Sequence, residues 1–163
     1  VVAIIGILAA VGVVAYNGYT KSAKESAVKA NHKNVVKFIS SEIMKCEIGE
    51  ELILKQNPTT NTDNLCSYVS AGNANEMATR FVNHFLSLNW CNQFGWMGGS
   101  KCAEAVESGG NIGDGTTGAI KLITKSGSPS VLFIDTKYTC EPEALTEVCN
   151  GKGKSLTDSV SLN

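Results

Sequence analysis

The amino-acid sequence predicts an α+β protein in which a long N-terminal helix packs, through its C-terminal half, against a small antiparallel β-sheet head. Residues 1–48 contain no proline and show helical spacing of apolar side chains. Two runs of alternating apolar and polar residues lie between 118 and 139. All six cysteines come after residue 45. These observations also predict a helical connecting region and disulfide-bounded loops.

The first sixteen residues, VVAIIGILAAVGVVAY, are apolar on every face of the predicted helix. At 1.5 Å per residue the whole helix is roughly 70 Å long, which is more than a small head covers. We therefore expect residues 1–24 to form an exposed helix and residues 25–163 to form the head. Something other than the head must bury the first part.

Several interpretations of this apolar stretch compete. A signal peptide ends in a cleavage site, whereas here the helical pattern continues without a break. A membrane span needs about 20 apolar residues, and this stretch is shorter. We expect further apolar residues before Val1.

From Tyr16 onward the apolar positions narrow to a stripe along one side of the helix. The stripe contains Tyr16, Tyr19, Ala23, Ala27, Val28, Val35, Ile39, Ile43 and Cys46. Residues 21–45 hold six lysines and two acidic residues, while residues 46–163 carry a net charge of −5. A basic helix and an acidic body can attract each other between copies, although single surface ion pairs are weak.

The connecting region begins after Gly49, a helix-ending residue. A loop is expected over Gln56–Asn64 and a second helix over Asn75–Leu88, capped by Asn73 or Asn75. Its apolar face is formed by Met77, Phe81, Phe85 and Leu88. A short helical piece is expected over Ser100–Glu107.

The sheet is expected to begin with a hairpin. Its strands are Gly118–Lys125 and Ser130–Thr139, joined by a turn over Ser126–Pro129. A third strand is expected over Leu145–Cys149. The polar tail, Gly151–Asn163, is either a flexible end or a final edge strand.

The even number of cysteines predicts a disulfide framework in an oxidising compartment. About 15 pairings are possible for six cysteines, and we favour the sequential one. It consists of Cys46–Cys66, Cys91–Cys102 and Cys140–Cys149. No C-x-x-C pair is present, and His32 and His84 are isolated, so no metal site is expected.

The sequence motifs do not indicate a catalytic site. Gly113–Gly118 matches G-x-G-x-x-G, but a strand rather than a helix is expected after it, which argues against a dinucleotide loop. The sequence has no Walker A loop and no G-x-S-x-G motif. We expect neither an enzyme nor a cofactor, and the balanced charge does not indicate nucleic-acid binding.

The segment Val1–Ala10, followed by Tyr16 and a lysine-bearing amphipathic helix, resembles the N-terminal helix of type IV pilins over residues 1–24. The resemblance implies a subunit of an extracellular pilus filament used for adhesion, twitching motility or DNA uptake. It also implies a prepilin peptidase, a methylated mature N-terminus, an inner-membrane assembly machinery and residence in the bacterial inner membrane before assembly. The implied filament-core residues are Val1, Val2, Ile4, Ile5, Gly6, Ile7, Leu8, Ala9, Ala10, Val11, Gly12, Val13, Val14 and Tyr16.

Many relatives in that family have a proline where this chain has Val14, and the stretch from Gly6 to that proline is often unwound in their filaments. Glycine weakens a helix by up to about 1 kcal/mol relative to alanine, so local melting near Gly6–Val14 is one expectation for a filament. The other is that Val14, in place of proline, keeps this stretch helical. Two other interpretations stay open. One is a major pseudopilin of a type II secretion system, and the other is a membrane-tethered, disulfide-bonded binding domain.

Overall fold

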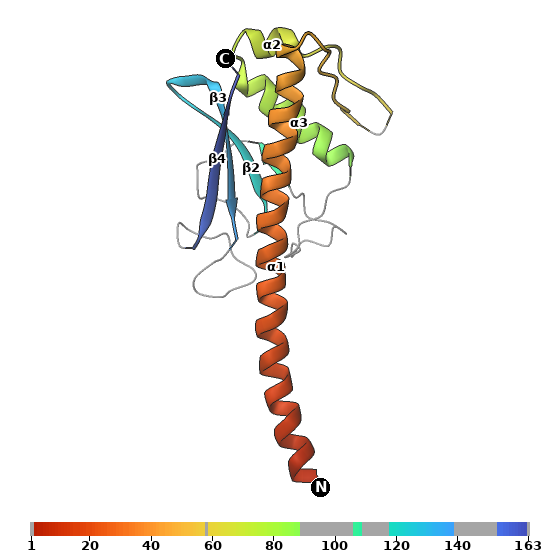
Figure 1. Ribbon diagram of the computed structural model, residues 1–163, viewed down its shortest axis with the longest axis vertical. Helices are drawn as coiled ribbons and strands as arrows, with labels where there is room; N and C mark the ends of the chain where they lie inside the picture. The colour runs from red at the N-terminus through yellow and green to blue at the C-terminus, as the bar shows by residue number, and fades with distance from the viewer. Residues whose placement is uncertain (1, 58, 89–105, 109–117, 139–152, 163) are drawn as a thin grey trace.

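The computed structural model describes residues 2–57, 59–88, 106–108, 118–138 and 153–162. The elements are α1 (Val2–Glu47), α2 (Cys66–Ser70), α3 (Ala74–Ser87), β1 (Val106–Ser108), β2 (Ile120–Lys125), β3 (Ser128–Lys137) and β4 (Ser155–Ser161). Figure 1 shows that one half of α1 lies against the other elements, while the other half projects away from them. The architecture is α+β, as the sequence predicts.

Helix α1 is continuous and is held to the head by one buried stripe. The stripe consists of Val28, His32, Val35, Ile39 and Ile43, at steps of three or four residues. Helix α1 contacts β3, β4 and α2, and its Phe38 packs against Phe81 and Phe85 of α3. The helix ends just before Gly49, whose φ of +81° is the left-handed conformation that glycine adopts without strain.

The segment after α1 folds back and is tied to it by a disulfide. Cys46 and Cys66 are bonded, with their Cα atoms 5.3 Å apart, which matches the first pair of the sequential scheme. Between them, Leu52 and Leu54 are fully buried. The short helix α2, which the sequence pattern did not predict, begins at Cys66.

Helix α3 packs against β2 and β3, and its apolar side chains belong to the same hydrophobic core as those of α1. It begins one residue earlier than expected and ends at Ser87. The side chain of Asn73 caps it by accepting a hydrogen bond of 3.2 Å from the Glu76 N–H. Its buried face includes Met77, Phe81 and Phe85, as the periodicity predicts, whereas Leu88, predicted on the same face, lies just after the helix and is 46% exposed.

The sheet has the order β1-β2-β3-β4. The strands β2, β3 and β4 are antiparallel, and β1 adds a short parallel pairing to β2. The predicted hairpin is confirmed, with a tighter turn than expected: Lys125 pairs with Ser128, and Gly127 has a φ of +93°. The core side chains of the hairpin are Ile120, Leu122, Leu132 and Ile134.

Strand β4 decides between the two interpretations of the polar tail. It pairs along β3 from Val131 to Lys137, so residues 155–161 form an edge strand. Leu156 and Val160 are partly buried, whereas the serines of the strand are exposed. The strand is polar because only one of its faces touches the core.

The prediction of a helix over Ser100–Glu107 is wrong for its last two residues. Val106–Ser108 forms β1 and pairs with Ile120–Leu122 of β2. A free strand edge offers backbone hydrogen bonds that local helical spacing does not reveal. Residues 100–105 and the third strand expected over Leu145–Cys149 lie outside the described residues.

Candidate assembly surface

The apolar N-terminal half of α1 is exposed. Ile5 and Val11 present 61% and 64% of their side-chain surface to solvent, and Tyr16 presents 68%. Among the side chains of α1 that the structure describes, the first buried one is Val28. Large apolar patches on soluble proteins mark surfaces that another molecule covers. This half of α1 is therefore the candidate site.

The structure describes many of the residues that the sequence assigns to a filament core. The exposed ones are Ile4, Ile5, Gly6, Val11, Gly12, Val13 and Tyr16. Val1 and the side chains of Val2, Ile7, Leu8, Ala9, Ala10 and Val14 lie outside what is described. Because apolar residues follow one another around the helix, the exposed surface is not confined to one stripe.

The glycines of this half have open space beside them in the described part of the chain. A Cβ atom added at Gly6, Gly12 or Gly18 would meet no described atom within 4 Å. Small residues on helices allow the backbones of neighbouring helices to approach closely. The helix runs unbroken through Gly6 and Gly12, and the melting expected in a filament stays a prediction.

The same half meets the criteria for a membrane span. An 18-residue window of α1 has a mean hydropathy of 1.6 and none of it is buried in the structure. Length and composition are the only basis for this assignment. They make the helix a candidate anchor and indicate no orientation.

The upper half of α1 carries a histidine that joins three elements. His32 is 1% exposed; its Nε2 lies 2.9 Å from Oδ2 of Asp158 on β4, and its Nδ1 lies 2.8 Å from Oγ1 of Thr136 on β3. A carboxylate only accepts hydrogen bonds, so Nε2 carries the proton and donates it to Asp158. His32 has no neighbouring metal-ligand residue in the sequence and is therefore expected to be isolated. Its position between Val28 and Val35 in the apolar stripe nevertheless indicates burial.

The second histidine packs on α1 from α3. The ring of His84 stacks on Phe38 with ring centroids 5.1 Å apart. Its Nδ1 accepts a hydrogen bond of 3.0 Å from the Lys55 N–H. Burial lowers the pKa of His84 below its ordinary value, the charge of Glu42 opposes this, and Lys55 lowers the pKa further. Both histidines therefore hold the head together.

The remaining candidate residues can be compared with the structure only where it describes them. Over the described ranges, no three His, Cys, Asp or Glu side chains are placed to hold a metal ion. Gly118, the last glycine of the G-x-G-x-x-G match, has a φ of +88° and donates its N–H to the Lys137 carbonyl at 2.8 Å. It leads into the hairpin. Cys91, Cys102, Cys140 and Cys149 lie outside the described residues.

Comparisons of this chain with protein-family models, with curated proteins and with solved structures found no match.

Proposed function

We propose that this chain is a structural subunit that polymerises through the N-terminal half of α1 into an extracellular type IV pilus filament. The observation that carries the proposal is the exposure of a helix that is apolar on all sides and projects away from its own head (Figure 1). The likeness of residues 1–24 to type IV pilins supports the same function.

Self-association is the simplest way to cover this helix in water. Burying a single Ile or Val side chain contributes about 1.5–3 kcal/mol. The N-terminal half of α1, which we call the stalk, exposes Ile4, Ile5, Val11 and Val13. Identical helices packed side by side would bury all of them. Gly6 and Gly12 would let the helices approach closely, since neither serves packing within the chain.

A membrane fits the same helix before assembly. In this proposal, the subunit waits in the bacterial inner membrane after processing by a prepilin peptidase, and an assembly machinery moves it into the filament. Lipid tails are as apolar as Leu, so close helix packing, rather than burial from water, favours the transfer into the filament. The disulfide at the upper end of α1 fits an oxidising, extracytoplasmic location.

A second candidate is a membrane-tethered binding domain. The observation in its favour is that α1 satisfies the length and composition of a membrane span. In that case the helix would be covered by lipid throughout, and the head would act alone. A type II secretion pseudopilin is a third candidate, since the likeness of residues 1–24 extends to the helix of that class.

Imaging of the protein released from producing cells tests the proposal. We expect shear to release long filaments in which a reconstruction shows the N-terminal halves of α1 packed in the centre and the heads outside. A detergent-soluble monomer without filaments would contradict the proposal and favour the tethered domain. Short filaments confined to the periplasm would favour the pseudopilin.

A further inference from the structure

The polarity of α1 changes over a short segment at the end of the stalk. Residues 1–20 contain no Asp, Glu, Lys, Arg or His, and the first charged residue is Lys21. The apolar run ends at Tyr16. We call the segment between these two points, Tyr16–Thr20, the boundary segment. It separates a helix that lipid can cover from one that it cannot, because a charge in hydrocarbon is costly.

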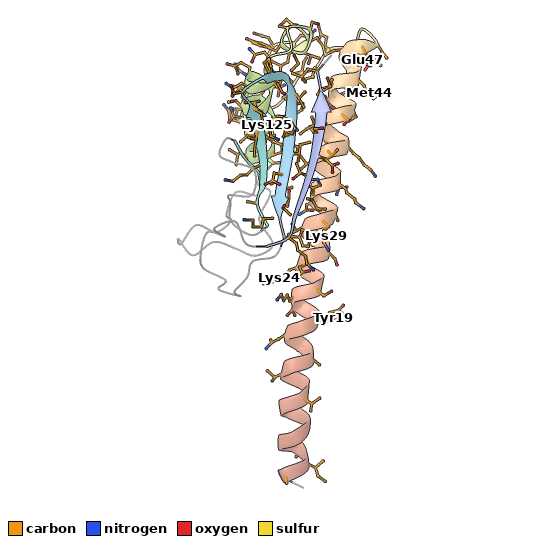
Figure 2. All side chains as sticks on the ribbon, turned by 90° about the vertical axis from the view of Figure 1, so that its left-hand side faces the viewer. Tyr19, Lys24, Lys29, Met44, Glu47 and Lys125 are labelled. Atoms are coloured by element: carbon orange, nitrogen blue, oxygen red, sulfur yellow. A yellow bond between two sulfur atoms is a disulfide. The ribbon has the colours of Figure 1, made fainter. Side chains whose placement is uncertain are left out.

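The boundary segment presents two tyrosine rings to solvent. Tyr16 and Tyr19 expose 68% and 75% of their surfaces, so the core of the head uses neither ring. Three residues of α-helix rotate by about 300°, which places the two rings about 60° apart around the axis. Figure 2 shows Tyr19 on the side of α1 that faces away from the sheet, whereas Lys24 is on the side of the sheet. The two tyrosines therefore form one exposed aromatic pair.

Tyrosine has the chemistry of a membrane–water interface. Its ring is apolar and its hydroxyl is polar, and tyrosine is enriched at the level of the lipid headgroups in membrane proteins. The helix axis from Val2 to Tyr16 is about 21 Å long, which is less than the thickness of the hydrocarbon core, about 30 Å. The apolar run from Val2 therefore fits within the hydrocarbon when the tyrosine pair lies among the headgroups.

We infer that, before assembly, Tyr16 and Tyr19 lie among the lipid headgroups and fix how far α1 enters the membrane. The partner of the tyrosine pair is the lipid surface, because the helix is apolar before the pair and charged after it. This inference rests on the membrane residence in the proposed function and adds to it the depth of the helix. The tethered binding domain would have the same depth.

The depth of the helix is limited in both directions. Moving α1 inward by two turns would bring the charges of Lys21 and Lys24 into the hydrocarbon, which is costly. Moving it outward by one turn would bring Val13 out of the hydrocarbon and lose part of the apolar burial. Between these limits, the tyrosine rings are the only large side chains of the boundary segment. They therefore supply the preferred position.

The same depth sets the height of the head. Val28, the first buried side chain among those described on α1, lies about 14 Å beyond Tyr19 along the axis. The buried stripe thus begins outside the hydrocarbon. Lipid covers the stalk in this arrangement, and the core of the head stays in water.

Thiol labelling of the full chain in lipid vesicles measures this depth. Ala15, Ser22 and Ser26 are exposed and lie within about 40° of one another around the helix, so single cysteines at these positions differ mainly in height. A membrane-impermeant maleimide added outside the vesicles reacts with a thiol that water reaches, because the thiolate is the reactive form. The unsubstituted chain gives the background from the native cysteines.

The three positions should react differently. We expect Ser22→Cys and Ser26→Cys to react readily. Ala15→Cys should react about tenfold more slowly, the ratio that corresponds to about 1.4 kcal/mol. Ser26→Cys also measures the fraction of heads that face outward, so the other two rates are expressed relative to it.

Replacing the tyrosines should shift the depth in opposite directions. Tyr16→Leu/Tyr19→Leu keeps apolar side chains but removes the hydroxyls, so α1 should sink until Lys21 reaches the headgroups, and Ser22→Cys should react about threefold more slowly. Tyr16→Ser/Tyr19→Ser removes the rings, so α1 should rise and Ala15→Cys should react about threefold faster.

The matched control is Tyr16→Trp/Tyr19→Trp, because tryptophan prefers the same interface. It should leave all three labelling rates unchanged. The thermal melting temperature of the head should be the same in every variant, since both tyrosines are exposed.

The outcomes separate this inference from the proposed function. If Ala15→Cys reacts as fast as Ser26→Cys, or if the Leu and Ser pairs leave the rates as they are with the native tyrosines, the tyrosine pair does not fix the depth, and the inference is rejected while membrane residence stands. If the full chain does not float with the vesicles in a density gradient, membrane residence before assembly fails, and the inference fails with it.

Discussion

The two halves of α1 are parts of one unbroken helix, yet they satisfy different requirements. The upper half has a single buried stripe, from Val28 to Ile43, and most of its exposed positions are polar. The lower half is apolar on every face, and its described side chains are exposed. The upper half is stabilised by its own head, whereas the lower half lacks a partner in the described part of the chain. A helix of this kind exposes apolar surface that a membrane or an assembly would cover.

The largest effect is expected from a charge in the lower half. Ile5→Lys should abolish detectable filaments, because an uncompensated ammonium group buried in a helix bundle is far more costly than an exposed one. The melting temperature of the head should not change, since Ile5 lies in the exposed half. Filament yield by sedimentation and electron microscopy, together with a thermal melt, checks both parts.

The matched control at this site is Ile5→Leu, which conserves volume and apolarity and is tolerated in most packed sites. It should assemble. If Ile5→Lys assembles as well as wild type, the lower half is not buried in a polymer and the contrast between the two halves loses its meaning.

The next largest effect is expected on the stability of the head, from a substitution in the upper half of α1. Ile39→Ala should lower the free energy of unfolding of the head by about 2–5 kcal/mol, because it leaves a cavity where a fully buried side chain was. Denaturant titration of the detergent-solubilised chain measures this. Val11→Ala, on the exposed half, should cost less than about 0.5 kcal/mol. Equal losses of unfolding free energy for the two variants would show that the head does not stabilise the upper half more than the lower half.

A smaller effect is expected at the junction of α1, β3 and β4. His32→Ala should destabilise the head by about 1–3 kcal/mol, because the buried Thr136 hydroxyl loses its partner. Asp158→Asn should cost less, since an amide oxygen can still accept the hydrogen bond from Nε2. Denaturant titration of both variants checks the order. A larger loss for Asp158→Asn than for His32→Ala would contradict the hydrogen-bond arrangement.

The smallest expected effect concerns pH. Burial lowers the pKa of His84, so the unfolded state binds a proton more readily than the folded state. The stability of the head should therefore fall as the pH drops from above about 6.5 and level off below the lowered pKa.

The variant His84→Gln can still accept the Lys55 N–H and does not titrate. Its unfolding free energy should fall less than that of wild type between pH 7 and 5, as measured by denaturant titration in matched buffers. An identical slope for both proteins would contradict the assignment.

Much of this molecule was determined by local sequence. The length of α1, the cap at Asn73, the face of α3 and the hairpin all follow from periodicity and turn residues within a few positions of one another. The exposed stalk follows too, because a helix that is apolar all round and longer than its head cannot be covered by that head.

The tertiary structure decided what depends on segments far apart in the chain. His32 meets partners 104 and 126 residues away, and β1 becomes a strand only because the edge of β2 is there to pair with it. The polar tail becomes β4 because β3 offers it an edge. Local spacing shows which face of an element is apolar, but hydrogen bonds between distant segments depend on which elements the folded core brings together.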